Sequence, residues 1–187
     1  MGKGRVEAFS DGVIAIIITI MVLELRAPHE ATIEALAPLW PVFLSYVLSF
    51  VYIGIYWNNH HHMLHAVKQV RGSVLWANLH LLFWLSLRPF TTAWMGENHF
   101  ATIPVAVYGF GLLMNAIAYT ILVRSLIATH GRDSDFAARI GSDKKGYVSL
   151  AMYIAAVGLA FVNAWISLAL YFAVAMVWLI PDRRFER

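Results

Sequence analysis

Long apolar segments recur along almost the whole chain, and they constrain its fold more than any other feature. Of the 187 residues, 60% are hydrophobic and 13% are charged, a balance that a single soluble core of this size does not accommodate. A helix needs about 20 predominantly apolar residues to cross the hydrocarbon core of a bilayer. The sequence therefore predicts an all-α integral membrane protein that lies in the lipid bilayer.

Six segments are predicted as transmembrane helices, at about residues 6–25, 37–60, 73–95, 102–126, 147–162 and 164–180. The last two are split because one helix over the whole stretch would be about 50 Å long, against a hydrocarbon core of about 30 Å. We expect this stretch to form a hairpin that turns near Asn163. Pro89 is expected to kink the third helix near its outer end.

Basic residues predict the orientation of these helices. Lys and Arg concentrate in cytoplasmic loops, and in a six-span arrangement all of them except Arg26 and Arg88 fall on one side. Both termini are therefore predicted to be cytoplasmic. The polar segment at about 127–146 is too short to form a second domain, so we expect residues 1–187 to form one multi-pass domain in the cell membrane. No nucleic-acid partner is expected, because the basic residues belong to no recognisable binding module.

The first apolar segment begins with a polar motif, Arg5 followed by Phe9, Ser10 and Asp11 in the pattern RxxxFSD. A carboxylate at the mouth of a membrane helix is costly, and it indicates a partner or a function. The motif resembles the signature of the transmembrane protein 175 family, whose bacterial members are potassium-permeable channels. The resemblance implies a homotetramer in which the first helix of each subunit lines a central pore.

Helical periodicity indicates which face of the first helix would line such a pore. At 100° per residue, Gly12, Ile16, Thr19 and Leu23 fall on one stripe within about 40–60°. Periodicity alone also fits ordinary packing or contact with lipid, and the upstream motif is what favours a pore. In the resembled family, aliphatic residues of this face form the narrowest rings. That implies rings at Ile16 and Leu23, with Thr19 as a polar ring between them and Ile20 as a neighbour.

An aliphatic ring passes an ion only after much of its hydration shell is removed or rearranged. Because K⁺ is more weakly hydrated than Na⁺, we expect modest selectivity for K⁺, with Rb⁺ and Cs⁺ also admitted. Two alternatives stay open: an ion-coupled secondary transporter, which typically shows repeats and midplane charges, and a proton-permeable channel. No enzyme activity and no cofactor are expected, because the chain lacks nucleophile, HExxH and phosphate-loop motifs.

Asp11 requires a partner from another helix, because Arg5 is six residues away on the opposite flank of its own helix. The polar and aromatic candidates at the same depth lie on the second and third helices: Asn58, Asn59, His60, His61, Trp76, Asn78 and His80. The resemblance implies that the motif packs against this group, and we expect a network of Asp11, Ser10, His61 and Trp76. Spacing does not decide which histidine takes part.

The histidines have the spacing of a metal site but lack its other ligands. His61 and His65 are four residues apart, as two zinc ligands on one helix face would be. No glutamate follows in an HExxH pattern and no third ligand is evident. We therefore expect no metal. A solvated cluster is the leading interpretation, and protonation of a histidine at the pore mouth is the alternative.

Two further features lie within the apolar segments. The residues from Tyr108 to Gly111 read YGFG, which superficially matches a potassium-filter sequence, but no Thr-Val and no pore-loop helix precede them. They are predicted to serve helix packing.

Arg88 and Glu24 are charges toward the outer side, and we expect either that they pair with each other or that Arg88 reaches the headgroups.

Overall fold

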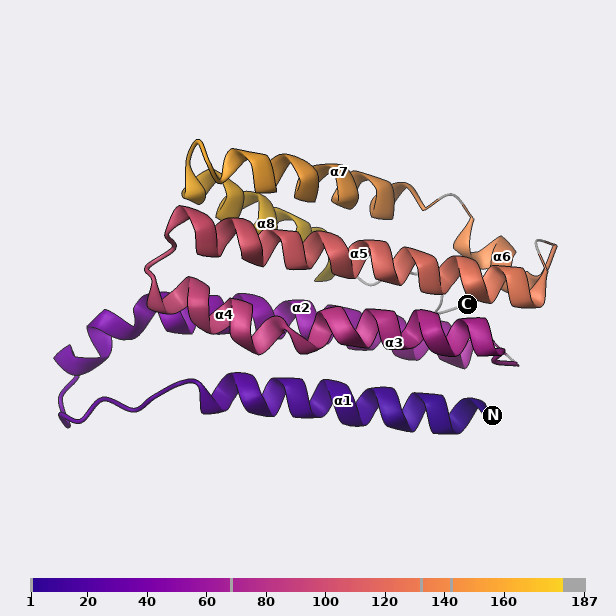
Figure 1. The fold of residues 1–187 in the computed structure, drawn as a ribbon, viewed down its shortest axis with the longest axis horizontal. Coiled ribbons are helices and arrows are strands. Elements are labelled where there is room, and N and C mark those ends of the chain that lie inside the picture. Colours follow the sequence, from indigo (N-terminus) through magenta and orange to yellow (C-terminus); the bar gives the residue numbers. More distant parts are fainter. Residues whose placement is uncertain (1, 68, 132, 142, 180–187) are drawn as a thin grey trace.

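The computed structural model describes residues 2–67, 69–131, 133–141 and 143–179, which form a bundle of helices (Figure 1). The helices are α1 Lys3–Leu23, η1 Glu34–Leu39, α2 Trp40–His65, α3 Gly72–Ser86, α4 Arg88–Glu97, α5 Thr102–His130, α6 Asp135–Ile140, α7 Lys144–Leu159 and α8 Ala164–Leu179. Three of them, α1, the continuous η1–α2 segment and α5, are long and apolar enough to cross a membrane, and α8 is a shorter apolar helix. The all-α class predicted from composition is confirmed.

The third predicted helix, 73–95, is not continuous. α3 ends at Ser86 and α4 begins at Arg88, with Leu87 between them. Pro89 accounts for the break, because proline has no N–H to donate to the carbonyl four residues back and its ring crowds that carbonyl. In Figure 1, α4 continues approximately along the line of α3. The two helices together therefore run in one direction along the bundle.

The polar segment at about 127–146 contains more helix than the sequence suggests, because α5 extends to His130 and α6 follows. A short polar side chain caps the start of α6 and another caps the start of α7. The Ser134 hydroxyl accepts from the Ala137 N–H (3.2 Å), and the Asp143 carboxylate accepts from the Gly146 N–H (3.0 Å). Each interaction satisfies a backbone donor that a helix start leaves without an intrahelical partner.

The helices are arranged so that α1 lies along one edge of the bundle and α7 along the opposite edge (Figure 1). α1 packs against α2, α3 and α4, while α5 packs against α3, α4, α7 and α8. Two hydrophobic clusters result. One joins α1, α2, α3, α5 and α6, and the other joins α2, α4, α5, α7 and α8. Because α1 packs on one side only, its other side is left uncovered.

The YGFG sequence lies inside α5, so its prediction as a packing segment is confirmed. Gly109 faces α8, where a methyl group in place of its hydrogen would overlap the hydroxyl of Tyr171. That hydroxyl donates to the Val105 carbonyl at 3.2 Å. The absence of a side chain at Gly109 is what lets α8 approach α5 closely.

Gly109→Ala is expected to lower the stability of the subunit by about 1–3 kcal/mol, because a buried site without free volume must shift to admit a methyl group. Gly111→Ala is the matched control, since a Cβ there meets Arg88 Nη2 at 3.5 Å, an ordinary contact distance. Thermal unfolding in detergent, followed by tryptophan fluorescence, measures both variants. Equal losses in the two variants would contradict this account of the α5–α8 contact.

Candidate functional site

The uncovered side of α1 is an aliphatic surface. Ile16 is 60% exposed and Leu23 74%, and both lie on the stripe predicted from periodicity; Ile20, expected as their neighbour, is 42% exposed. The opposite face of α1 is buried against the bundle and consists of Val6, Ser10, Ile14, Ile17 and Met21. One helix therefore carries two apolar faces, of which the subunit itself covers only one.

Thr19 places an oxygen among these aliphatic side chains. Its hydroxyl donates to the Ala15 carbonyl one turn earlier, at 2.9 Å. Because the proton is used within the helix, the oxygen presents its acceptor lone pairs to the exposed side. The predicted polar ring thus has the chemistry of an acceptor.

A buried hydrogen-bonded chain fixes the start of α1 to α2 and α3. The Ser10 hydroxyl donates to the Val6 carbonyl at 2.8 Å and accepts from Asn78 Nδ2 at 2.9 Å. Asn78 Oδ1 lies 2.7 Å from His60 Nε2. Since Oδ1 can only accept, His60 must carry its hydrogen on Nε2. Ser10, His60 and Asn78 are each at most 2% exposed, so this chain is closed to solvent.

Asp11 has a different partner from those expected. Trp57 Nε1 donates to Asp11 Oδ1 at 3.1 Å, while His61 Nδ1 lies 3.3 Å from Glu7 Oε1. The expected pairing of Asp11 with His61 and Trp76 is therefore wrong. Trp57 and His61 are one turn apart on α2, and their rings stack with centroids 5.9 Å apart. The sequence analysis missed Trp57, although its four-residue spacing from His61 places the two side chains on one face of α2.

The other predicted motif residues lie outside these two contacts. Arg5 is exposed, Phe9 is 53% exposed, and Trp76 is 75% exposed. His80 accepts a hydrogen bond from Trp84 Nε1 on its own helix at 3.0 Å, so it does not join Asp11. The structure thus brings together Ser10, His60 and Asn78 from the predicted set.

The histidine cluster has no metal geometry in the part of the chain that the structure describes. His61 and His65 lie with ring centroids 6.1 Å apart. Among the described residues, no three His, Cys, Asp or Glu side chains group closely enough to hold a metal ion.

Arg88 neither pairs with Glu24 nor reaches the surface, so both expectations for it are wrong. It is 1% exposed and lies over the ring of Tyr108, 4.6 Å from the centroid, whereas Glu24 is exposed. Among the described residues no hydrogen-bond partner reaches its Nη1 or Nη2. The face of an aromatic ring attracts a cation. The hydroxyl of the same Tyr108 lies 3.0 Å from Ser49 Oγ, and Ser49 Oγ lies 2.7 Å from Thr92 Oγ1.

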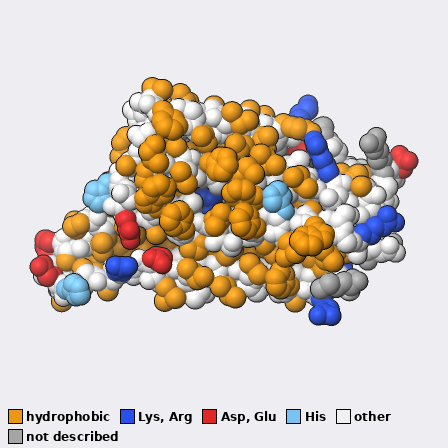
Figure 2. All heavy atoms as spheres, viewed as in Figure 1, with side chains coloured by type: hydrophobic (Ala, Val, Ile, Leu, Met, Phe, Trp, Pro, Cys, Tyr) orange, Lys and Arg blue, Asp and Glu red, His pale blue; other side chains and the backbone are white. Residues whose placement is uncertain are grey.

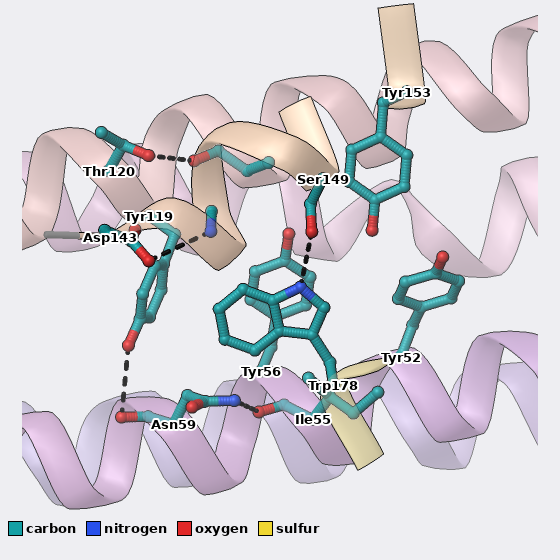
Figure 3. Close-up of a pocket in the computed structure, with 12 residues that line it drawn as sticks. Tyr52, Ile55, Tyr56, Asn59, Tyr119, Thr120, Asp143, Ser149, Tyr153 and Trp178 are labelled. Carbon is teal, nitrogen blue, oxygen red and sulfur yellow. Dashed lines mark hydrogen bonds between the residues drawn. The ribbon is translucent and has the colours of Figure 1, made fainter. Parts of the chain in front are cut away.

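A small cavity of about 50 Å³ lies between α2, α5, α7 and α8 (Figure 3). Tyr52 and Tyr56 from α2 and Tyr153 from α7 point toward one another across it, and Trp178 Nε1 donates to Ser149 Oγ at 2.8 Å. Its volume suits a few water molecules. Among its described lining residues none comes from α1, so it is separate from the exposed aliphatic face.

Comparison with known proteins identifies the family. Residues 5–89, which include the motif and end in the first turn of α4, match the family described as endosomal/lysosomal potassium channel TMEM175. The chain is also 54% identical, over 187 residues, to a potassium channel of Chryseobacterium sp. strain P1-3, a match that covers 100% of this chain and 97% of that protein. The chain belongs to the TMEM175 family.

Further TMEM175 relatives agree along the length of the chain. A potassium channel of Streptomyces collinus is 35% identical over 188 residues, covering 94% of this chain and 91% of that protein. The crystal structure of a lysosomal potassium-selective channel TMEM175 homolog from Chamaesiphon minutus matches with a TM-score of 0.83 at 30% identity, covering 96% of this chain and 97% of that one. The predicted family is confirmed, and with it a membrane protein from a family of ion channels rather than of enzymes.

Proposed function

We propose that this TMEM175 protein is a potassium-permeable cation channel of the cell membrane. The proposal is a homotetramer in which the α1 helices of four subunits surround the central path. The observation that carries it is the exposed aliphatic face of α1, with Ile16 60% and Leu23 74% exposed, along one edge of the bundle. Cyclic symmetry around that edge covers these side chains and creates a path that one subunit does not enclose. The potassium-channel names of the bacterial relatives support the same function.

The proposed membrane arrangement has six crossings, by α1, η1–α2, α3 with α4, α5, α7 and α8, and it places both termini in the cytoplasm. In Figure 2, Lys and Arg side chains gather mainly at the right-hand end, where Figure 1 places the N-terminus, and Asp and Glu mainly at the other end. This distribution supports the orientation, because basic residues are enriched on the cytoplasmic side.

The proposed selectivity arises from dehydration. Ile16 and Leu23 form aliphatic rings, with Ile20 beside them, and each ring removes water from a passing ion. K⁺ loses its water more readily than Na⁺, so it passes more easily, and Rb⁺ and Cs⁺ also pass. The Thr19 oxygen between the rings offers partial replacement for the lost water.

A liposome assay tests the function. Liposomes that contain the purified protein and are loaded with K⁺ are expected to release it down its gradient without any coupled ion. Release that requires a second ion and saturates would favour a transporter, and acidification without K⁺ movement would favour a proton channel. The absence of any flux would contradict all three.

Native mass spectrometry of the full-length protein tests the assembly, and the expected mass is that of four chains. The pore requires several copies around one axis. A monomer under conditions that preserve flux would overturn the arrangement of α1 around a shared path.

A further inference from the structure

A groove of about 390 Å³ runs between α5 and α7, at the end of the bundle that carries α6. Half of its lining residues are aliphatic, among them Ile117, Ile121, Ile127 and Leu150. Arg124 and Tyr147 stand at its polar end. Thr120, Asp143 and Gly146 line both this groove and the cavity of Figure 3, so the two are adjacent.

The length of α5 places the polar end of the groove at the membrane surface. With 29 residues, α5 is about 43 Å long, whereas the hydrocarbon core is about 30 Å thick. If α5 begins at one interface, Arg124 lies about 33 Å along it and therefore at the opposite headgroup layer. Ile117 and Ile121 lie one to two turns deeper, at the level of the acyl chains.

A guanidinium stands at the rim of the groove. Arg124 Nη2 donates to the Tyr147 hydroxyl at 3.3 Å, and no carboxylate in the described part of the chain pairs with this guanidinium. The Asp143 carboxylate is directed to the first turn of α7, where it accepts from the Gly146 N–H at 3.0 Å. Lys144, the next residue along the chain, is exposed. The Arg124 guanidinium and the Tyr147 hydroxyl thus offer donors to an anion, while the Asp143 carboxylate is used at the start of α7. The aliphatic side chains of the groove suit an apolar chain.

We propose that the α5–α7 groove binds an anionic phospholipid, with an acyl chain along Ile117, Ile121 and Leu150 and the phosphate at Arg124 and Tyr147. The groove is formed on the side of the bundle opposite to α1 (Figure 1). With α1 at the pore axis it faces lipid, in the cytoplasmic leaflet, and this placement rests on the proposed function. Basic pockets between transmembrane helices on the cytoplasmic side are suited to anionic headgroups.

Native mass spectrometry of the full-length protein in detergent tests the headgroup preference. The probes are dioleoyl phosphatidylglycerol and dioleoyl phosphatidylcholine, which differ in headgroup charge and share their acyl chains. One basic side chain near the headgroup corresponds to a preference for the anionic lipid of about fivefold. We expect Arg124→Gln to lose this preference. Arg71→Gln is expected to keep the preference. This substitution removes the same charge, but Arg71 is an exposed residue before α3 and does not line the groove.

A substitution and a competition experiment test the apolar part of the groove. Ile121→Trp fills the groove and is expected to reduce the binding of both lipids, while its melting temperature reports that the protein is folded. Equal binding of the two lipids by the unmodified protein, or an unchanged preference in Arg124→Gln, would overturn the proposal. Displacement of the lipid by an equal concentration of inorganic phosphate would also overturn it, because the acyl chain would then contribute nothing. Lipid binding is counted per chain, so failure of the tetramer and failure of the groove are distinguishable.

Discussion

Ile16→Asn is expected to raise the sodium permeability of the channel until it is close to the potassium permeability. Ile16 is 60% exposed on the stripe that we assign to the pore. If dehydration at this ring selects the ion, an amide supplies oxygen and water where the isoleucine removed them. Both ions then pass at similar cost, and the conductance also rises.

Reversal potentials under bi-ionic conditions measure this change in the permeability ratio. Val22→Asn is the matched control, because Val22 is 44% exposed but lies about 120° around α1 from Ile16. It is expected to leave the ratio unchanged. Leu23→Ala is expected to lower selectivity less than Ile16→Asn does. An unchanged ratio in Ile16→Asn would mean that this residue does not select and that the constriction lies elsewhere.

Thr19→Val separates dehydration from replacement of the lost water. The Thr19 hydroxyl donates to the Ala15 carbonyl, so its oxygen lone pairs are the groups offered to an ion. If aliphatic rings alone select, the valine variant keeps its potassium preference. A loss of preference would assign selectivity to the oxygen of Thr19.

The exposed face of α1 could be predicted from sequence because helical geometry fixes the relative directions of side chains on one helix. The partner of Asp11 could not, because it depends on the rotation of α2 relative to α1. Neighbouring residues such as His60 and His61 point about 100° apart, so the rotation of α2, which the sequence does not give, decides which of them faces α1. In the structure His60 faces α3, and Trp57 is the side chain that reaches Asp11.

Arg88 is a second residue whose surroundings could not be predicted from the sequence. A long basic side chain near the end of a predicted span usually extends to the interface. Here the helix breaks at Leu87 and α4 begins at Arg88 itself, so the direction of this side chain depends on how α4 continues after the break. The guanidinium lies over Tyr108 of α5. Proline at position 89 predicted a disturbance but not the direction in which it would turn the preceding residue.

Asn78→Ala is expected to destabilise the subunit more than Asp11→Ala. Asn78 is 2% exposed and joins Ser10 of α1 to His60 of α2. Its removal leaves the His60 Nε2–H buried without an acceptor and deprives the Ser10 oxygen of a donor, at a cost of about 1–3 kcal/mol for each buried group left unsatisfied. The Asp11 contact is different, because Trp57 is 45% exposed. Water replaces the acceptor there, so we expect a loss of at most about 1 kcal/mol.

Thermal unfolding of the full-length protein in detergent ranks the two variants. Asn98→Ala is the control for the loss of an asparagine side chain, since Asn98 is exposed and bonds the Trp94 carbonyl one turn away at 2.8 Å. It is expected to unfold near the temperature of the unmodified protein. Because Ser10 and Asn78 lie behind the exposed face of α1, the Asn78→Ala channels that do assemble are expected to keep their potassium preference. A larger loss of stability in Asp11→Ala would contradict this ranking. Lost selectivity in stable Asn78→Ala would show that the buried chain acts on the passing ion as well as on the position of α1.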